Sequence, residues 1–242
     1  MESRKLKGTP VLWLPVLAPL FVVVNAWVAA WLTGDRVYHP GLNPWIDFAG
    51  HILIGWTLFV YPIYMSLLAA LFHGIEHRAS AWKMIYALPV PRRITFLSKL
   101  ALFTGLITIS QLLLWGLAEA GGTLIGLLKP AFGFQHYSLH EVLIRGSAGS
   151  LLSGLGLAAF QFCLAFRFSG FIVPAGFGLL MTMTGAISRS WPVSQASPFL
   201  WPVCFFNNSI EIAHWQYRFV FFGIILYLLM LLAVGNTRPR RI

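Results

Sequence analysis

Six long apolar segments constrain this chain more than any other feature of its sequence. A helix needs about 20 apolar residues to cross the hydrocarbon core of a bilayer. With 58% hydrophobic and only 10% charged residues, the chain has too little polar surface for a water-soluble globule. The sequence therefore predicts an all-α, polytopic membrane protein, a single transmembrane domain over residues 1–242 with no soluble domain. The predicted spans are residues 11–32, 51–71, 100–118, 146–166, 168–187 and 219–234.

The distribution of basic residues predicts which side of the membrane each loop and terminus faces. Cytoplasmic loops of membrane proteins carry an excess of lysine and arginine. If both termini are cytoplasmic, twelve of the 17 basic residues lie inside: three before residue 8, five in residues 72–99, Arg167, and three after residue 237. The other five lie outside, so we expect six spans with both termini in the cytoplasm. Topology thus accounts for the net charge of +10, and we expect the lipid bilayer and no nucleic acid as a partner.

Prolines mark both the first span and the loop before the last one. The apolar run of residues 11–32 is longer than the 7–15 residues of a signal-peptide core, so we expect an uncleaved span. Pro10 and Pro15 are expected to separate a short interfacial helix from it. In residues 188–218, tryptophan and proline alternate with apolar residues. Broken backbone at membrane depth must be covered by protein or line a cavity. We therefore expect re-entrant-like short helices that cap the outer side, and an ordinary interfacial loop is the open alternative.

A stripe of small residues runs along the fourth span. Small residues every four positions share one helix face and let backbones approach closely in lipid. Packing within the subunit and a dimer seam with a second copy are both open interpretations. The residues are Gly146, Ser150, Gly154 and Ala158.

Residues 72–99 form the long polar interruption of this apolar chain, and they include five of the basic residues. Residues 79–88 are good helix formers, and Pro89 ends this helix because the residue before a proline disfavours the α region. Arg92 and Arg93 follow at the tip. An amphipathic helix on the cytoplasmic side suits docking into a groove of a soluble partner. One side of the helix carries Trp82, Ile85 and Tyr86, and Arg78 and Lys83 are turned away.

Motif searches argue against chemistry on this chain. It contains no GxxxxGK[ST] phosphate loop, no GxSxG and no HExxH. Residues 73–77 read H-x-x-E-H, but a zinc enzyme needs a third protein ligand and an open position, and no third ligand is evident. Cys163 and Cys204 lack metal-ligand spacing, and the spans lack the carboxylates and histidines of a proton relay. We therefore expect no catalytic residue, no metal site and no cofactor bound by this chain.

The order of residues in the charged segment is similar to that of a known family. Glu76 is followed by Trp82, then by Leu88-Pro89-Val90, an arginine, and Phe96-Leu97-Ser98-Lys99. This order resembles the first cytoplasmic loop in the permease subunits of type 2 ABC exporters, closest to the branch associated with lantibiotic and bacitracin self-immunity. The position of the loop between the second and third spans agrees with the topology above.

The resemblance implies that this chain forms the membrane pathway and that a separate subunit binds ATP. Residues 72–99 would be a coupling loop that docks on a separate ATP-binding subunit, which carries the ATP and magnesium. A second permease chain, identical or related, would complete the transporter in the plasma (inner) membrane. The apolar, aromatic spans suit ATP-driven export of a peptide or a lipid-like substrate, as in peptide antibiotic resistance. The coupling residues would be Glu76, Arg78, Trp82, Lys83, Ile85, Tyr86, Leu88, Pro89, Arg92 and Arg93.

Two other interpretations stay open. One is a membrane enzyme that acts on lipid at residues 188–218, with the polar groups of Asn207, Asn208, Glu211 and His214. The other is a non-transporting assembly or signalling module that uses the same docking loop. Co-purification with an ATP-binding subunit separates the enzyme from the other two, and stimulation of ATP hydrolysis by a substrate separates the exporter from the module.

Overall fold

The computed structural model shows a helical protein, which confirms the prediction of an all-α fold. It describes residues 9–39, 41–78, 92–168, 170–206 and 214–236, and these contain no strand. The main helices are α2 (Pro10–Val37), α3 (Pro44–Gly55), α4 (Tyr61–Arg78), α6 (Arg92–Leu128), α7 (His140–Arg167), α8 (Ile172–Ser188) and α10 (Tyr217–Asn236). The short elements are the π-helix η1 (Trp56–Val60), the α-helix α9 (Trp201–Phe206), and the 3-10 helices η2 (Pro130–Phe132), η3 (Phe134–His136), η4 (Pro192–Ala196) and η5 (His214–Gln216).

Four helical segments are long and apolar enough to cross a membrane. They are α2, the continuous stretch Pro44–Gly74 formed by α3, η1 and most of α4, α6 from Arg93, and α7. α8 and α10 are apolar but shorter. Each predicted span overlaps one of these six segments, four of which are long enough to cross a membrane.

The predicted end of the third span is wrong. Residues 100–118 were expected to end at Glu119 and the two glycines that follow, but α6 continues for 37 residues to Leu128. The glycines serve close packing instead of ending the helix. A Cβ at Gly121 would lie 3.3 Å from Val23, and a Cβ at Gly122 would overlap the Trp45 ring. Small residues allow helices to approach closely, and here they allow α2 and α3 to pack against α6.

The predicted break at Pro15 is also wrong, whereas the residues before Thr9, where the short interfacial helix was expected, lie outside the described residues. α2 is continuous through Pro15 and Pro19, and Pro10 is its first residue. A proline at the first position costs nothing, because that N–H has no partner inside the helix. Prolines farther in are tolerated in membrane helices whose neighbours support the backbone. Both internal prolines are buried, and α2 packs along α6.

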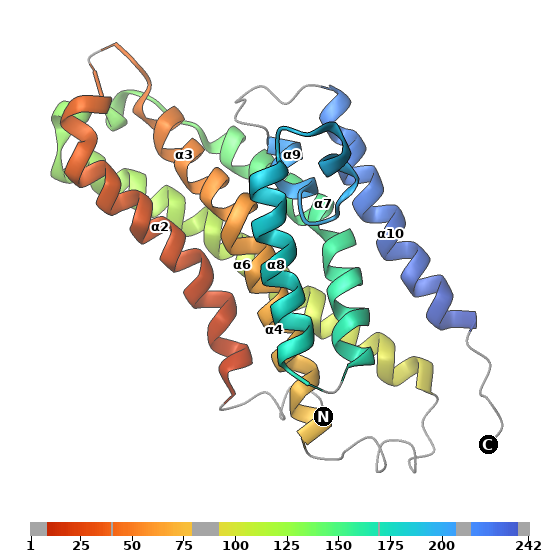
Figure 1. Ribbon diagram of the computed structural model, residues 1–242. Coiled ribbons are helices and arrows are strands. Elements are labelled where there is room, and N and C mark those ends of the chain that lie inside the picture. Colours follow the sequence, from red (N-terminus) through yellow and green to blue (C-terminus); the bar gives the residue numbers. More distant parts are fainter. Residues whose placement is uncertain (1–8, 40, 79–91, 169, 207–213, 237–242) are drawn as a thin grey trace, which may run out of the picture.

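The helices form an elongated bundle in which α7 is central (Figure 1). α7 packs against α4, α6, α9 and α10, and α2 packs against α6 on the other side. The start of α2, the end of α4, the start of α6 and the end of α10 lie at the lower end of the view (Figure 1). The described ends of the chain therefore lie on the same side as the charged segment.

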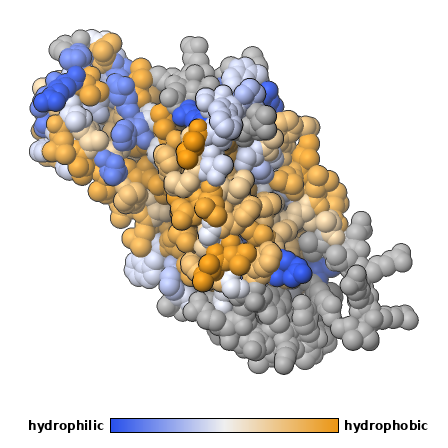
Figure 2. Space-filling view, in the orientation of Figure 1, coloured by the Kyte–Doolittle hydropathy of each residue, from blue (hydrophilic) through white to orange (hydrophobic). Residues whose placement is uncertain are grey.

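Hydrophobic side chains cover the middle of the face shown in Figure 2, and hydrophilic ones gather near its upper end around the α2–α3 connection. Many large apolar residues of α2 and α10 are exposed, such as Leu32 at 74% and Leu232 at 66%. A water-soluble protein does not expose apolar surface on this scale. This band is the surface that a bilayer would cover.

The region between α8 and α10 contains the three short helices η4, α9 and η5 at the upper end (Figure 1). α9 packs against α7 and η1, and it buries Val203 and Phe205. The Trp201 indole N–H donates to the Gln195 carbonyl oxygen over 3.0 Å, which ties α9 to η4. This proline-rich segment therefore folds back onto the bundle.

Candidate functional site

The charged segment joins the lower ends of α4 and α6 (Figure 1). Glu76 and Arg78 belong to the last turns of α4, and Arg92 and Arg93 begin α6. Of these four, the structure describes the side chain of Arg93, which is exposed. The other predicted coupling residues lie outside the described residues; they are Trp82, Lys83, Ile85, Tyr86, Leu88 and Pro89.

Aromatic rings connect both flanks of the charged segment to α7. α4, α6 and α7 each contribute rings from positions near the lower end. We name this group the basal aromatic cluster. Its members are Phe72, His73, Phe96, Phe103, Phe162 and Phe166.

Phe162 of α7 is at the centre of the basal aromatic cluster and is fully buried. Its ring centroid lies 4.5 Å from that of His73, 5.2 Å from that of Phe96 and 5.4 Å from that of Phe103. Centroid separations of 4.5–7 Å with tilted or edge-on rings are the favoured geometry of aromatic pairs. One side chain of α7 thus touches both helices that flank the charged segment.

The histidine that opens the H-x-x-E-H pattern is part of this cluster. His73 is 1% exposed, and its ring packs edge-on against Phe162. The side chains of Glu76 and His77 lie outside what the structure describes. Within the described part of the chain, no three histidine, cysteine or acidic side chains are placed to hold a metal ion. His73 packs as an aromatic residue among phenylalanines.

The stripe of small residues on α7 faces the chain's own helices. A Cβ at Gly146 would lie 2.7 Å from Leu53, and one at Gly154 would lie 2.5 Å from Tyr61. Ser150 and Ala158 are fully buried. Packing within the subunit therefore occupies these four positions. These residues therefore do not form the dimer seam that the sequence left open, because a side chain covered by its own subunit cannot contact a second copy.

Other glycines of α7 leave room for large side chains of α9. A Cβ at Gly156 would lie 2.5 Å from Trp201, and one at Gly149 would overlap Phe205. α7 thus contacts α4 on one face and α9 on another through backbone left open by glycine. Close contact of this kind is what drives helix association in lipid, where the hydrophobic effect gives no preference between helix and lipid tail.

Neutral polar side chains lie buried in the middle of the bundle, beside the π-helix η1. The Tyr64 and Ser110 hydroxyl oxygens are 2.6 Å apart, and the Ser150 hydroxyl donates to Gln111 Oε1 over 3.4 Å. These contacts link α4 to α6 and α6 to α7. π-helical turns occur often at functional sites, and here the turn places Trp56 and Tyr61 in ring contact, with centroids 5.3 Å apart.

Gln161 lies farther along α7 than Ser150 and is a buried polar residue of a different kind. It is fully buried, and neither of its amide atoms has a hydrogen-bond partner among the described residues. A Cβ at Gly178 of α8 would lie 2.9 Å from its Nε2 atom. A buried polar group without a partner costs about 1–3 kcal/mol. Charge does not reveal these buried polar residues, because they are neutral; serine and glutamine inside apolar runs are their signal in the sequence.

The polar residues of the lipid-enzyme alternative fall largely outside the described residues. Asn207, Asn208 and Glu211 lie in the segment 207–213, and His214 begins η5 without a described side chain. No geometry in the described residues therefore brings catalytic groups together in this region.

The fold and the charged segment together define an α-helical membrane component with its polar connection at one end. Comparison with protein families places it further: the model described as "ABC-2 family transporter protein" matches residues 1–185. The match covers most of the chain, and the chain belongs to this family. It is the membrane permease component of an ABC transporter, a component that is not itself the ATPase and works with an ATP-binding subunit. No curated protein and no solved structure matched the chain.

Proposed function

We propose that this permease subunit exports a peptide or an amphipathic, lipid-like substrate, driven by ATP and magnesium on a separate ATP-binding subunit that docks on residues 72–99. The proposal includes six spans with both termini in the cytoplasm, in the plasma (inner) membrane, and a second permease chain. The family supports the ATP-binding partner. The position of the charged segment between α4 and α6, at the same end as both described chain ends, supports the topology.

The basal aromatic cluster is the observation that carries the mechanism. A partner that pushes on the charged segment displaces the ends of α4 and α6. Phe162 packs against rings of both helices, so that displacement reaches α7 directly. Protein interiors are close-packed and resist continuous deformation. α7 therefore moves as a rigid body together with the helices that pack closely against its glycines.

The interior supports an amphipathic substrate. The buried polar group beside η1 is neutral, with hydroxyls and amides from α4, α6 and α7. Such groups hydrogen-bond to peptide or headgroup atoms without attracting a small ion strongly. The surrounding surface is apolar and aromatic, which suits hydrocarbon.

Two substitutions in the charged segment test the docking. The permease is co-expressed with its ATP-binding subunit, and the amount of partner that co-purifies is measured along with ATP hydrolysis in liposomes. We expect Glu76→Gln combined with Trp82→Ala to insert normally but to lose most of the bound partner. The matched control carries the same changes at the opposite end, Glu141→Gln with Trp191→Ala; both residues are exposed there.

The control variant is expected to keep the partner and its ATP hydrolysis. If the Glu76/Trp82 variant retains wild-type partner and hydrolysis, the docking proposal is refuted. If the partner stays bound and ATP is hydrolysed but no cargo moves under any condition tested, the non-transporting module replaces the exporter.

A third variant tests transmission through α7. Phe162→Leu removes ring contacts with α4 and α6 and keeps an apolar side chain of similar size. We expect it to retain the ATP-binding subunit but to lose the coupling between hydrolysis and transport. Phe160→Leu is the control, because Phe160 packs against Phe177 and Phe199 instead of the basal cluster. Equal coupling in the two variants would rule out this route.

A further inference from the structure

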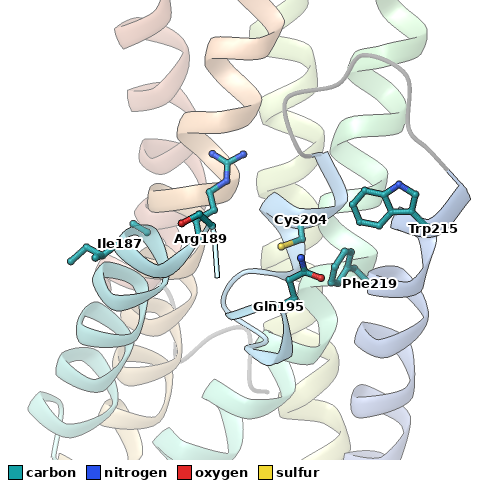
Figure 3. A pocket seen from close by; sticks show the side chains of 8 residues that line it. Ile187, Arg189, Gln195, Cys204, Trp215 and Phe219 are labelled. Atoms are coloured by element: carbon teal, nitrogen blue, oxygen red, sulfur yellow. The ribbon is translucent and has the colours of Figure 1, made fainter. Parts of the chain in front are cut away.

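A pocket of about 410 Å³ lies at the upper end of the bundle, between α8, α9, η4 and the start of α10 (Figure 3). Ile187 and Arg189 lie on one side of it, and the opposite side is formed by Gln195, Cys204, Trp215 and Phe219 (Figure 3). The predicted docking segment is at the other end of the molecule. Docking of the ATP-binding subunit therefore does not account for this pocket.

Arg189 lines this pocket, and Arg218 lies beside it, in contact with three of the lining residues. The Arg218 guanidinium donates to Gln195 Oε1 over 2.6 Å, so the side chain that lines the pocket is held by a cation. The guanidinium also lies over two rings, 5.0 Å from the centre of Trp215 and 4.8 Å from that of Phe219. Cation–π contacts of this kind hold a guanidinium against ring faces. A guanidinium carries five N–H donors, and the bond to Gln195 uses one of them.

The positive charge extends across the pocket. Burial raises the pKa of the Cys204 thiol, and the charges of Arg189 and Arg218 act on it in the opposite direction. Arg189 lines the pocket on one side, and Gln195, which accepts from Arg218, lines it on the other (Figure 3). A ligand with negative charge is favoured here.

A second cavity, of about 370 Å³, lies next to the first one. It shares Gln195 with the pocket and runs along α10 over apolar side chains. Phe222 and Leu229, which are 43% and 55% exposed, line it on the lipid-facing side of α10. These two residues are separated by about 10 Å along the helix, roughly two thirds of one leaflet of the hydrocarbon core. The remaining lining residues are Ala196, Trp201, Ile225 and Leu226.

We propose that the two cavities hold one anionic membrane phospholipid, with its phosphate at Arg218 and Gln195 and an acyl chain in the groove along α10. A cationic pocket that continues into an apolar groove at Gln195 matches the two parts of such a molecule. Exposed Trp191 and Trp215 at this end are typical of the headgroup layer. This site does not rest on the proposed export, because a lipid binds here whatever the transporter moves.

The test uses the full-length purified protein in detergent. It is titrated with phosphatidylglycerol and with phosphatidylcholine of the same acyl chains, and bound lipid is counted by native mass spectrometry. We expect phosphatidylglycerol to bind the wild type about tenfold more tightly, which corresponds to about 1.4 kcal/mol. Arg218→Gln should abolish this preference, and Arg218→Lys should keep part of it because the charge remains.

Two further variants separate the pocket from the groove and from general charge. Ala196→Phe fills the groove and should weaken both lipids about equally. Arg145→Gln removes an arginine that pairs with Glu141 on α7, away from both cavities, and should leave the preference intact. Inorganic phosphate alone should not compete at the concentrations where the lipid binds.

Several results would overturn the proposal. They are equal binding of the two lipids by the wild type, an unchanged preference in Arg218→Gln, wild-type binding in Ala196→Phe, or full competition by inorganic phosphate. If Arg218→Gln does not fold, the comparison of the two lipids on the wild type and on Ala196→Phe still decides.

Discussion

Gly223 is the point where α10 crosses α7 most closely. A Cβ added there would lie 2.5 Å from the carbonyl oxygen of Leu152 and 2.6 Å from that of Ser153. Both are backbone atoms of a regular helix, so neither can rotate away. Ordinary van der Waals contact begins at 3.4 Å, so Gly223→Ala must push α10 off α7 by roughly 1 Å. Overpacking of this kind costs about 1–3 kcal/mol.

Gly116→Ala in α6 is the matched control, because no atom lies within 4 Å of a Cβ built there. Alanine is favoured over glycine in a helix by about 1 kcal/mol in both variants. The difference between the variants therefore isolates the cost of separating α7 from α10. For a chain of this length we expect Gly223→Ala to melt about 2–12 °C below Gly116→Ala. Melting is followed by the fraction that stays monodisperse after heating in one detergent. Equal or higher stability of Gly223→Ala would refute the packing described here.

Three further substitutions probe other parts of the bundle by melting temperature. Gln161→Met removes an amide that has no partner among the described residues and should stabilise by about 1–3 kcal/mol; a lower melting temperature would contradict this. Trp45→Phe leaves the Phe134 carbonyl, which accepts its indole N–H over 3.0 Å, without that donor and should destabilise by a similar amount. Burial, and secondly the Asp47 carboxylate, raises the pKa of Tyr38 to about 12. The stability that the neutral Tyr38 phenol contributes is complete below pH 10 and is lost as the pH rises towards 12, so Tyr38→Phe should reduce the loss of stability between pH 10 and 12.

The apolar runs predicted where the helices are, but they did not predict where the helices end. Turn-forming glycines and a charge after residue 118 suggested an end, yet α6 continues because Gly121 and Gly122 receive Val23 and Trp45 from other helices. The same residue type ends a helix when it adopts a left-handed conformation, as Gly133 does after η2 with φ of 77°. Only tertiary contacts distinguish the two uses.

The candidate site was likewise predictable from the sequence only in part. The charge of residues 72–99 is visible in the sequence because it contrasts with an apolar background. The basal aromatic cluster is not visible, because its phenylalanines resemble every other apolar residue of the spans. Phe162 and Phe166 do share a helix face at a spacing of four, but nothing in the sequence says that this face meets α4 and α6. Their role follows only from the packing of three helices.

The small residues of α7 show why packing has to be known before a dimer is assigned. In lipid, a helix face of small residues attracts any partner that can approach closely, whether it comes from the same chain or from another. Here Leu53, Tyr61 and Trp201 of the same chain fill the positions opposite Gly146, Gly154 and Gly156. These contacts stabilise the subunit itself. The second permease chain that we propose would therefore bind a surface that the subunit leaves exposed, and substitutions at these glycines should impair folding of the subunit itself.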